Sequence, residues 1–279
     1  MTHMILSQTV KDGLLAAVRE AGKTEIMPRF RNLPEGSIES KAHADDLVTI
    51  ADKRSELLIA ERAAKLLPSA LIIGEEAVAD DPALLGKMAD ADVSVVIDPI
   101  DGTSAFVSGL ATFGVLLAVR VNGQTEYGLL YDPIMDDWVV AERGQGTQFV
   151  NAAGKSRQLR VPAVKPMDQM QGYVPLYLFP KDQQPIIAQA YPKFKRITTL
   201  RCSCHEYRMM ATGHSDFTLN PMSKPWDHMA GILALEECGG RVESHDGLPY
   251  DPTDPKGPLW AFAFEDRATQ DKIKASFLG

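Results

Sequence analysis

The stretch VVIDPIDGTSAF, residues 95–106, joins an apolar run to two acidic residues and then to a Gly-Thr-Ser turn. The apolar run predicts a buried strand that ends at Asp98. Pro99 fixes its own φ and restrains the residue before it, so Asp98 and Asp101 can be aimed at one point. Buried carboxylates are costly unless a cation neutralises them, and Mg²⁺ takes oxygen ligands, including a main-chain carbonyl such as that of Ile100. We therefore expect a metal site here.

Gly102, Thr103 and Ser104 follow the second acid and are typical of the start of a helix. The free N–H groups and the dipole at a helix N-terminus attract anions such as phosphate. A metal beside an anion site suggests phosphoryl chemistry. Taken alone, the same residues also fit a plainer interpretation, in which Asp98 caps a turn and Asp101 caps the following helix.

The composition is that of an ordinary soluble globular protein. The 279 residues include 29 Lys and Arg against 37 Asp and Glu, which leaves a net charge of -8. That charge argues against a nucleic-acid polymer or an anionic membrane as the main partner. The N-terminus lacks the pattern of a secretory signal, and no apolar run approaches about 18 residues, so we expect a cytoplasmic protein.

The first half of the chain, residues 1–150, contains helical patterns followed by strand patterns. Apolar spacing predicts a helix near the N-terminus and a second helix over about 51–67. The apolar face of the second helix is expected to comprise Leu57, Leu58, Ala60, Ala64 and Leu67. Short apolar runs at 70–73 and 93–97 predict strands that each end in acids. Residues 113–150 predict an antiparallel meander in which Asn122-Gly123 forms a two-residue hairpin.

The second half, residues 151–279, alternates between helix and strand patterns. We expect helices over about 204–211, 226–238 and after 266, and strands over 216–219, 241–244 and 259–264. No low-complexity linker separates the halves, and no internal repeat is found. The sequence therefore predicts a single domain over residues 1–279, of mixed α/β layers with much antiparallel sheet (α+β type).

Three further motifs accompany DPIDGT: KAHADDLVTIAD at 41–52, GEE at 74–76 and WDHMAG at 226–231. In this order and at these separations, the four motifs resemble the inositol monophosphatase family over nearly the whole chain. Each motif is weak alone, but a chance match of all four is not expected. The resemblance implies the layered αβαβα sandwich of the inositol monophosphatase and fructose-1,6-bisphosphatase type, with its site at the junction of the halves. It also implies Mg²⁺-dependent, lithium-sensitive hydrolysis of a small phosphate monoester, and a homodimer.

Carried over position by position, the resemblance implies a set of oxygen ligands for two or three Mg²⁺ ions. Glu75, Asp98 and the carbonyl of Ile100 would hold the first ion. Asp98, Asp101 and Asp227 would hold the second. Two such ions can activate a water molecule and neutralise the phosphoryl oxygens, so no covalent phosphoenzyme is required.

The remaining roles implied by the resemblance concern the water and the phosphate. Glu76 would join the outer metal shell or help bind a third, weaker ion; the alternative is a solvated acid beside the true ligand. Asp52 would hydrogen-bond Thr103, whose hydroxyl would orient the attacking water together with Glu75. For Asp52 alone, the alternative is a charge at a helix N-terminus. The phosphate would be bound by the turn residues Gly102, Thr103 and Ser104.

Substrate choice is expected in the second half, where the chain departs from the family pattern. Inositol phosphatases commonly carry a glutamate where this chain has Asn220, and an amide lacks the charge. Arg201-Cys202-Ser203 replaces a Gly-Thr-Ala-like turn, and we count Arg201 and Ser203 among the substrate contacts with Asp227. Arg201 could bind a second phosphate or a carboxylate, or could form a surface salt bridge.

The leading hypothesis is a phosphatase for a small phosphorylated polyol or sugar, with inositol 1-phosphate as the reference substrate. The family also includes 3′(2′),5′-bisphosphate nucleotidases, histidinol phosphatases and fructose-1,6-bisphosphatases, and these activities stay open. A hypothesis of another class is a non-catalytic regulatory protein that binds phosphorylated ligands. The cysteines Cys202, Cys204 and Cys238 predict reduced thiols, and a soft-metal site with His205 is the weaker alternative.

Overall fold

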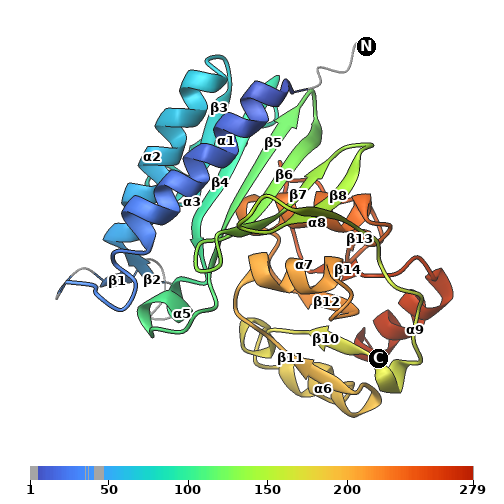
Figure 1. Ribbon diagram of the computed structural model, residues 1–279. Helices are drawn as coiled ribbons and strands as arrows, with labels where there is room; N and C mark the ends of the chain where they lie inside the picture. Colours follow the sequence, from blue (N-terminus) through green and yellow to red (C-terminus); the bar gives the residue numbers. More distant parts are fainter. Residues whose placement is uncertain (1–5, 35, 37, 41–46, 279) are drawn as a thin grey trace.

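Two large β-sheets and three layers of helices make up the structure, a computed structural model described for residues 6–34, 36, 38–40 and 47–278 (Figure 1). Residues 41–46, the first half of the KAHADDLVTIAD motif, lie outside the described residues. No helix within the described ranges is long and apolar enough to cross a membrane.

The helices that the structure describes lie before, between and after the strands of both sheets. The α-helices are α1 Gln8–Ala21, α2 Ile50–Leu66, α3 Glu75–Asp80, α4 Ala83–Gly86, α5 Thr103–Val107, α6 Gln184–Ala188, α7 Ser203–Ala211, α8 Pro225–Glu237 and α9 Arg267–Leu278. A π-helical turn, Gly22–Ile26, extends α1, and short 3₁₀ turns cover Met167–Gln169, Leu176–Leu178 and Tyr191–Lys193.

The strands form a seven-stranded sheet, a five-stranded sheet and one small antiparallel pair. The pair is β1 Ile38–Ser40 and β2 Leu47–Thr49. The seven-stranded sheet contains, in spatial order, β3 Leu71–Gly74, β4 Val93–Asp101, β5 Gly114–Val121, β6 Gln124–Asp132, β7 Asp137–Glu142, β8 Gly146–Val150 and β9 Ser156–Leu159. The five-stranded sheet contains, in spatial order, β11 Arg196–Thr198, β10 Gln171–Tyr173, β12 Phe217–Asn220, β14 Leu259–Phe262 and β13 Arg241–Ser244.

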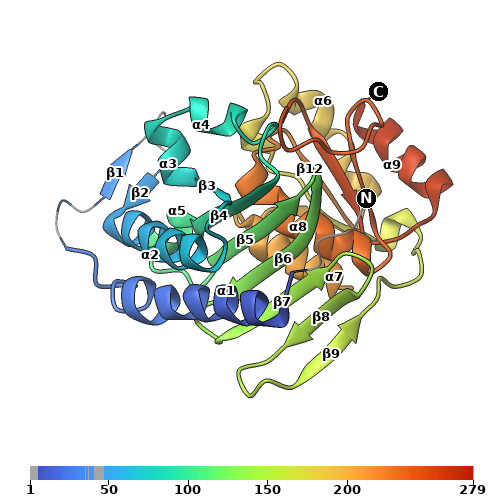
Figure 2. The same cartoon turned by 90° about the horizontal axis from the view of Figure 1, so that it is seen from above.

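The predicted meander is confirmed as strands β5 to β8 of the seven-stranded sheet, and β9 extends it at the edge (Figure 2). Asn122 and Gly123 join β5 to β6 with φ values of 48° and 89°. Positive φ at both positions is what a type I′ hairpin turn requires, which explains why this dipeptide predicted the turn. Strands β3 and β4 are parallel, so their carboxyl ends lie at the same edge of the sheet.

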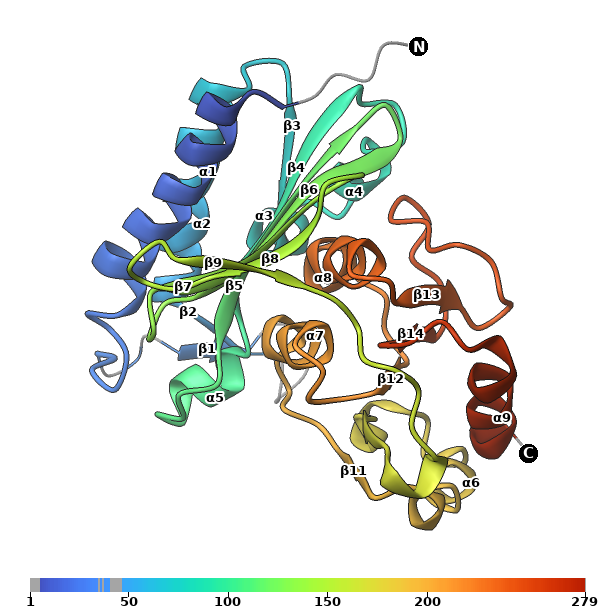
Figure 3. The ribbon, with the colours of Figure 1, turned by 45° about the vertical axis from the view of Figure 1, so that its right-hand side comes forward.

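The helices cover both sheets in the order that the resemblance implied. Helices α1 and α2 lie on one face of the seven-stranded sheet, and α7 and α8 lie between its other face and the five-stranded sheet (Figure 3). Helix α9 packs on the far side of the five-stranded sheet, where Phe277 contacts Phe194, Phe217 and Trp260. The layered α+β fold predicted from the sequence is confirmed.

Strand β4 is buried along its whole length because both of its faces are covered. Val95 and Ile97 belong to the core shared with α1 and α2, whereas Val96 belongs to the core shared with α7 and α8. Side chains of a strand alternate between its faces. The alternation therefore places Asp98 on the face that α8 covers.

The apolar face expected for α2 is confirmed only in part, because Leu58, Ala60 and Leu67 pack against the core but two other members do not. Leu57 is 61% exposed and Ala64 is also exposed, whereas Ile59 is buried. The buried side of α2 also carries Asp52 and Glu56, one helical turn apart. Because polar residues take positions on the buried side, the pattern of apolar residues placed the centre of the buried face incorrectly.

Candidate active site

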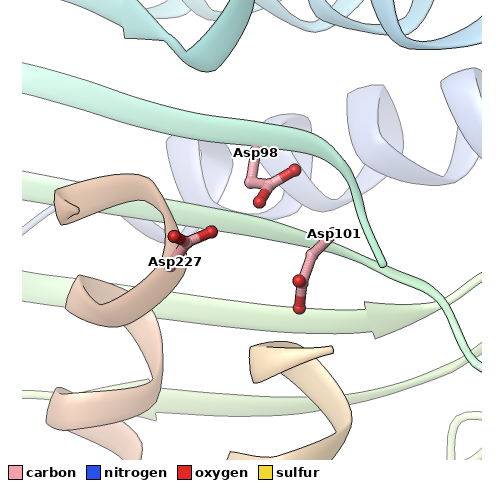
Figure 4. Close-up of side chains that lie close together, drawn as sticks. All are labelled: Asp98, Asp101 and Asp227. Atoms are coloured by element: carbon pink, nitrogen blue, oxygen red, sulfur yellow. The ribbon is translucent and has the colours of Figure 1, made fainter. Parts of the chain in front are cut away.

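Three aspartates converge where the end of β4 meets the first turn of α8. Carboxylate oxygens of Asp98, Asp101 and Asp227 all lie within 4.8 Å of one another (Figure 4). Asp98 and Asp101 are 1% and 7% exposed. Oxygen atoms this close can share one cation, so the cluster can hold a hard metal ion.

A β-bulge brings Asp101 to the same side as Asp98. Residues three apart in a regular strand point to opposite faces. Here the register shifts between the two aspartates, because Asp98 pairs with Leu116 and Asp101 pairs with Gly114, so three steps on β4 match two on β5. The extra residue of the bulge turns Asp101 toward Asp98. Two aspartates three residues apart can therefore lie on the same side of β4 only because of this bulge.

The electrostatics of the cluster favour a bound cation. Burial raises the pKa of Asp98 well above its ordinary value, and the charges of Glu75, Asp101 and Asp227 raise it further. Burial and the charge of Asp227 raise the pKa of Asp101 in the same way. Among the described residues, no Lys or Arg forms an ion pair with Asp98 or Asp101. An all-oxygen donor set whose charges repel one another fits a divalent cation such as Mg²⁺.

Glu75 and Glu76 start α3 directly after β3, at the same sheet edge as Asp98. The register pairs Gly74 with Ile97, so the residues that follow each strand are neighbours. Glu75 lies outside the three aspartates of the cluster, yet its charge contributes to the raised pKa of Asp98. Glu76 is 8% exposed, so it is not the solvated acid of the plainer interpretation.

Glu56 of α2 holds the start of α3, and the sequence analysis missed it. Its carboxylate accepts hydrogen bonds of 2.8 Å from the backbone N–H groups of Glu76 and Ala77. A Cβ at Gly74 would lie 2.0 Å from the carboxyl carbon of Glu56, so only glycine fits there. Burial raises the pKa of Glu56 to about 7. The sequence did contain a signal for this role, because Glu56 follows Asp52 by four residues and therefore lies on the same side of the helix.

Asp52 contacts two threonines, one through each of its carboxylate oxygens. Oδ2 accepts hydrogen bonds from the backbone N–H and the hydroxyl of Thr49 in a capping box, at 2.9 and 2.6 Å. Oδ1 lies 3.2 Å from the hydroxyl oxygen of Thr103, which also lies 2.9 Å from the carbonyl oxygen of Ile100. The expected contact between Asp52 and Thr103 is therefore present, and so is the alternative role at a helix N-terminus. Burial raises the pKa of Asp52 to about 7.

Asp101 also joins the two halves of the chain. Its Oδ2 accepts a hydrogen bond from the backbone N–H of Cys204, and the thiol of Cys202 donates to the same oxygen at 3.3 Å. Asp101 therefore caps α7, whose own N-cap residue, Cys202, makes no side-chain capping bond. The plainer interpretation is confirmed for Asp98, whose Oδ1 caps a turn by accepting a bond of 3.1 Å from the N–H of Ile100. It is wrong for Asp101, because the N-terminus of α5 has no side-chain cap.

A cavity of about 140 Å³ opens beside the acidic cluster. Four of the predicted substrate contacts line it, namely Arg201, Ser203, Asn220 and Asp227, together with Asp101. The predicted phosphate contacts Gly102, Thr103 and Ser104 lie on the β4–α5 turn and are not part of this lining. A larger cavity, of about 690 Å³, lies between β9 and the end of α8, away from the three aspartates. We assign the site to the smaller cavity because Asp101 and Asp227 of the acidic cluster line it.

The cysteines and the neighbouring histidines have structural contacts. All three cysteines are free, as predicted, and the structure shows that they are buried. Nε2 of His205 lies 3.0 Å from the carbonyl oxygen of Phe113, and the ring nitrogens of His228 contact the Tyr207 hydroxyl and the Met222 carbonyl. In the part of the chain that the structure describes, the soft-metal site considered for the C-x-C motif is absent.

Comparison with known proteins agrees with this geometry. The model of the inositol monophosphatase family matches residues 7–273. The Nus factor SuhB of Pasteurella multocida is 36% identical over 213 residues, which cover 73% of this chain and 73% of that protein. Both matches include the DPIDGT region and much of each half of the chain.

Solved structures share the fold. The IMPase of Thermotoga maritima has a TM-score of 0.80 at 23% identity, over 97% of each chain. An IMPase/NADP phosphatase complexed with Mg²⁺ and phosphate has a TM-score of 0.81 at 19% identity, over 96% of this chain and 95% of that one. At these identities the likeness extends to the fold alone.

Proposed function

The chain belongs to the inositol monophosphatase family, and we propose that it is a Mg²⁺-dependent phosphatase that hydrolyses a small phosphate monoester with water as the nucleophile. The observation that carries the proposal is the convergence of Asp98, Asp101 and Asp227 from two distant parts of the chain. The bulge in β4 and the docking of α8 both serve this convergence. A fold of this size does not need a cluster of buried acids for its stability.

The proposed ligand roles follow the positions of the carboxylates. Asp98, Asp101 and Asp227 would hold one Mg²⁺, and Asp98 would share a second with Glu75 and the carbonyl of Ile100. Glu76 would act from the outer shell. When bound, Mg²⁺ supplies charge that lowers the pKa of a water molecule and neutralises phosphoryl oxygens.

The chain's own groups would position the water and the ester. The hydroxyl of Thr103 would orient the attacking water, and Oδ1 of Asp52 would keep that hydroxyl in place at 3.2 Å. Backbone N–H groups of Gly102 and Thr103, with Ser104, would bind the phosphate at the turn after β4. Gly102 has a φ of 89°, which lets the chain turn sharply between the metal ligands and α5.

The experiment measures phosphate release from p-nitrophenyl phosphate with Mg²⁺, without Mg²⁺ and with EDTA. Wild-type protein is expected to turn over only with Mg²⁺, and Asp227→Asn is expected to lose turnover while keeping the wild-type circular dichroism spectrum. Inositol 1-phosphate is the reference substrate. The bisphosphorylated nucleotide, histidinol phosphate and fructose 1,6-bisphosphate complete the panel, compared by kcat/KM.

A second candidate function is a regulatory protein that binds phosphorylated ligands without turnover. The observation that favours it is the name of a similar curated protein, Nus factor SuhB. The same assay separates the candidates. Absence of Mg²⁺-dependent release from every ester, with Mg²⁺ binding retained, would refute the phosphatase and favour the regulator.

Other parts of the proposal extend the resemblance. We propose one domain over residues 1–279, with most metal ligands in 1–150 and the specificity elements in 151–279; the core shared by β5, β6 and α8 supports this. We also propose two or three Mg²⁺ ions, inhibition by lithium, a homodimer, a cytoplasmic location and no nucleic-acid polymer as partner. Metal titration and light scattering test the ion number and the dimer.

A further inference from the structure

The size of the cavity decides which part of a substrate it can enclose. Pockets that enclose a whole small-molecule ligand measure roughly 300–1,000 Å³. The cavity beside Asp101 and Asp227 measures about 140 Å³. It is therefore too small to enclose a whole ester. Because the proposed phosphate contacts at 102–104 are not part of its lining, the cavity faces the alcohol of the ester, and a larger alcohol would extend over the exposed residues at its mouth. Specificity must come from these lining residues.

Large apolar side chains form one side of the mouth. Tyr177, Leu178 and Met222 line the cavity and are 43%, 39% and 37% exposed. Exposed large apolar residues gathered at one concave site indicate a surface that binds a ligand. A fully hydroxylated alcohol would leave its hydroxyl groups against these side chains without partners, whereas a planar apolar group would pack on them.

Arg201 provides the positive charge of the lining. Its guanidinium carbon lies 5.1 Å from the ring centre of Tyr177, and no described residue forms an ion pair with it. The surface salt bridge considered for this residue is therefore not supported. A guanidinium stacked on a ring keeps its N–H edge available for a carboxylate or a phosphate.

The turn that carries Arg201 is held in an unusual conformation. Arg201 has a φ of 55°, in the left-handed region that favours glycine. Oε1 of the buried Glu206 accepts hydrogen bonds from the hydroxyl of Thr199 at 2.8 Å and the backbone N–H of Leu200 at 2.7 Å. The Thr199 hydroxyl in turn accepts a bond of 3.0 Å from the N–H of Arg201. A long cationic side chain thus occupies a strained position that a buried carboxylate maintains.

We call Tyr177, Met222, Arg201 and Asn220 the wall of the cavity, as distinct from the proposed metal ligands Asp101 and Asp227 that also line it. The polar groups that this wall presents are hydrogen-bond donors. Oδ1 of Asn220 accepts a bond of 3.0 Å from the backbone N–H of Met222, which directs the amide's donor nitrogen to other partners. The carboxylate of Glu206, which also lines the cavity, already accepts bonds from the turn. Donors at Arg201 and Asn220 match an acceptor group on the substrate, and a second anion is the strongest acceptor.

We propose that this wall selects phosphate monoesters whose alcohol combines a planar apolar body with a second anionic group, in preference to neutral polyols. The body would pack on Tyr177 and Met222, and the anion would bind Arg201 and the amide nitrogen of Asn220. The inference rests on the proposed phosphatase activity of the same site.

The experiment compares three monoesters of primary alcohols at fixed Mg²⁺, so that the leaving groups are chemically matched. They are 4-carboxybenzyl phosphate, benzyl phosphate and glycerol 1-phosphate. The expected order of kcat/KM is carboxybenzyl above benzyl above glycerol, with the carboxylate worth roughly tenfold, as for one charge-assisted hydrogen bond. A wild-type preference for glycerol 1-phosphate would overturn the inference but not the phosphatase. Absence of Mg²⁺-dependent turnover of all three esters would instead refute the proposed function.

Substitutions of the wall residues test whether the wall determines the substrate preference. Arg201→Met and Arg201→Gly both remove the guanidinium, and the second also removes the backbone strain, so misfolding does not obscure the result. Both are expected to reduce the carboxybenzyl-to-benzyl ratio at least fivefold, mainly through KM, and Tyr177→Ser is expected to reduce the benzyl-to-glycerol ratio. Arg196→Met, an exposed arginine of β11 away from the cavity, is the matched control and is expected to keep both ratios. Retention of the wild-type carboxybenzyl-to-benzyl ratio in both Arg201 variants would overturn the inference.

Discussion

Asp98→Asn tests the acidic cluster through both stability and activity. The substitution keeps the size of the side chain and the oxygen that accepts a 3.1 Å bond from the N–H of Ile100, and it removes one charge. Two unit charges 4.8 Å apart repel each other by about 3.5 kcal/mol at an effective dielectric constant of about 20. Because the raised pKa values of Asp98 and Asp101 favour protonation, which already relieves part of the repulsion, less than this is recovered. We expect the metal-free variant to be more stable by about 1–3 kcal/mol.

The expected change in melting temperature follows from the chain length. An unfolding entropy of about 2.1 cal/mol/K per residue over 279 residues converts that gain into a rise of about 2–5 °C in EDTA. Mg²⁺ at a hundred times its Kd adds about 2.7 kcal/mol to the wild-type protein, or about 5 °C. The variant is expected to show no such response to Mg²⁺ and to lose turnover.

The assay is thermal unfolding followed by circular dichroism, in EDTA and in saturating Mg²⁺, with turnover of p-nitrophenyl phosphate measured on the same samples. Asp92→Asn is the matched control, because Asp92 is an exposed acid just before β4. It is expected to behave as wild type in both solutions. A lower melting temperature of Asp98→Asn in EDTA, together with a normal rise in Mg²⁺, would refute the reasoning.

The remaining predictions concern the residues around the cluster. Glu56→Ala leaves two backbone N–H groups without their acceptor, so we expect a loss of about 2 kcal/mol in urea unfolding and a higher Mg²⁺ requirement, whereas the exposed Glu61→Ala should change neither. Thr103→Val keeps the shape of the side chain but removes the hydroxyl, and is expected to lower kcat at least about 100-fold at unchanged Mg²⁺ affinity. Burial raises the pKa of Glu206 from 4.5 to about 7, so the folded state binds more protons and stability is lost as pH rises between these values. Glu206→Gln should reduce that loss in unfolding measured at pH 5 and pH 8, and an equal slope would contradict the pKa shift. Leu57→Gln, on the exposed side of α2, should change the unfolding free energy by less than about 0.5 kcal/mol; a larger loss would restore the face first expected.

Local patterns were sufficient for most of the elements. The run before Asp98 predicted β4, and the dipeptide Asn122-Gly123 predicted the hairpin between β5 and β6. Both predictions depend on interactions between residues close in the chain, such as turn geometry and the alternation of side chains. Short strands such as β10 and β11 escaped prediction because three residues carry too little pattern.

The candidate site was predictable only in part. Order and spacing of four motifs identified the family and the acids that would act together. The partners of those acids were not predictable: Glu56 below α3, and the cap that Asp101 provides for α7 across the boundary between the halves. The expected face of α2 was incorrect in part for the same reason, because a buried acid is stable only where another element brings backbone donors to it.

The chain's linear order thus specifies its helices, its hairpins, its charge and its membership of a family, because each of these depends on neighbours along the chain or on motif spacing. The meeting of Asp227 with Asp98 and Asp101, the bulge that turns Asp101 inward and the small cavity with its apolar mouth arise from packing between distant elements. Distances between such elements depend on how sheets and helices fill space, and no local periodicity encodes them.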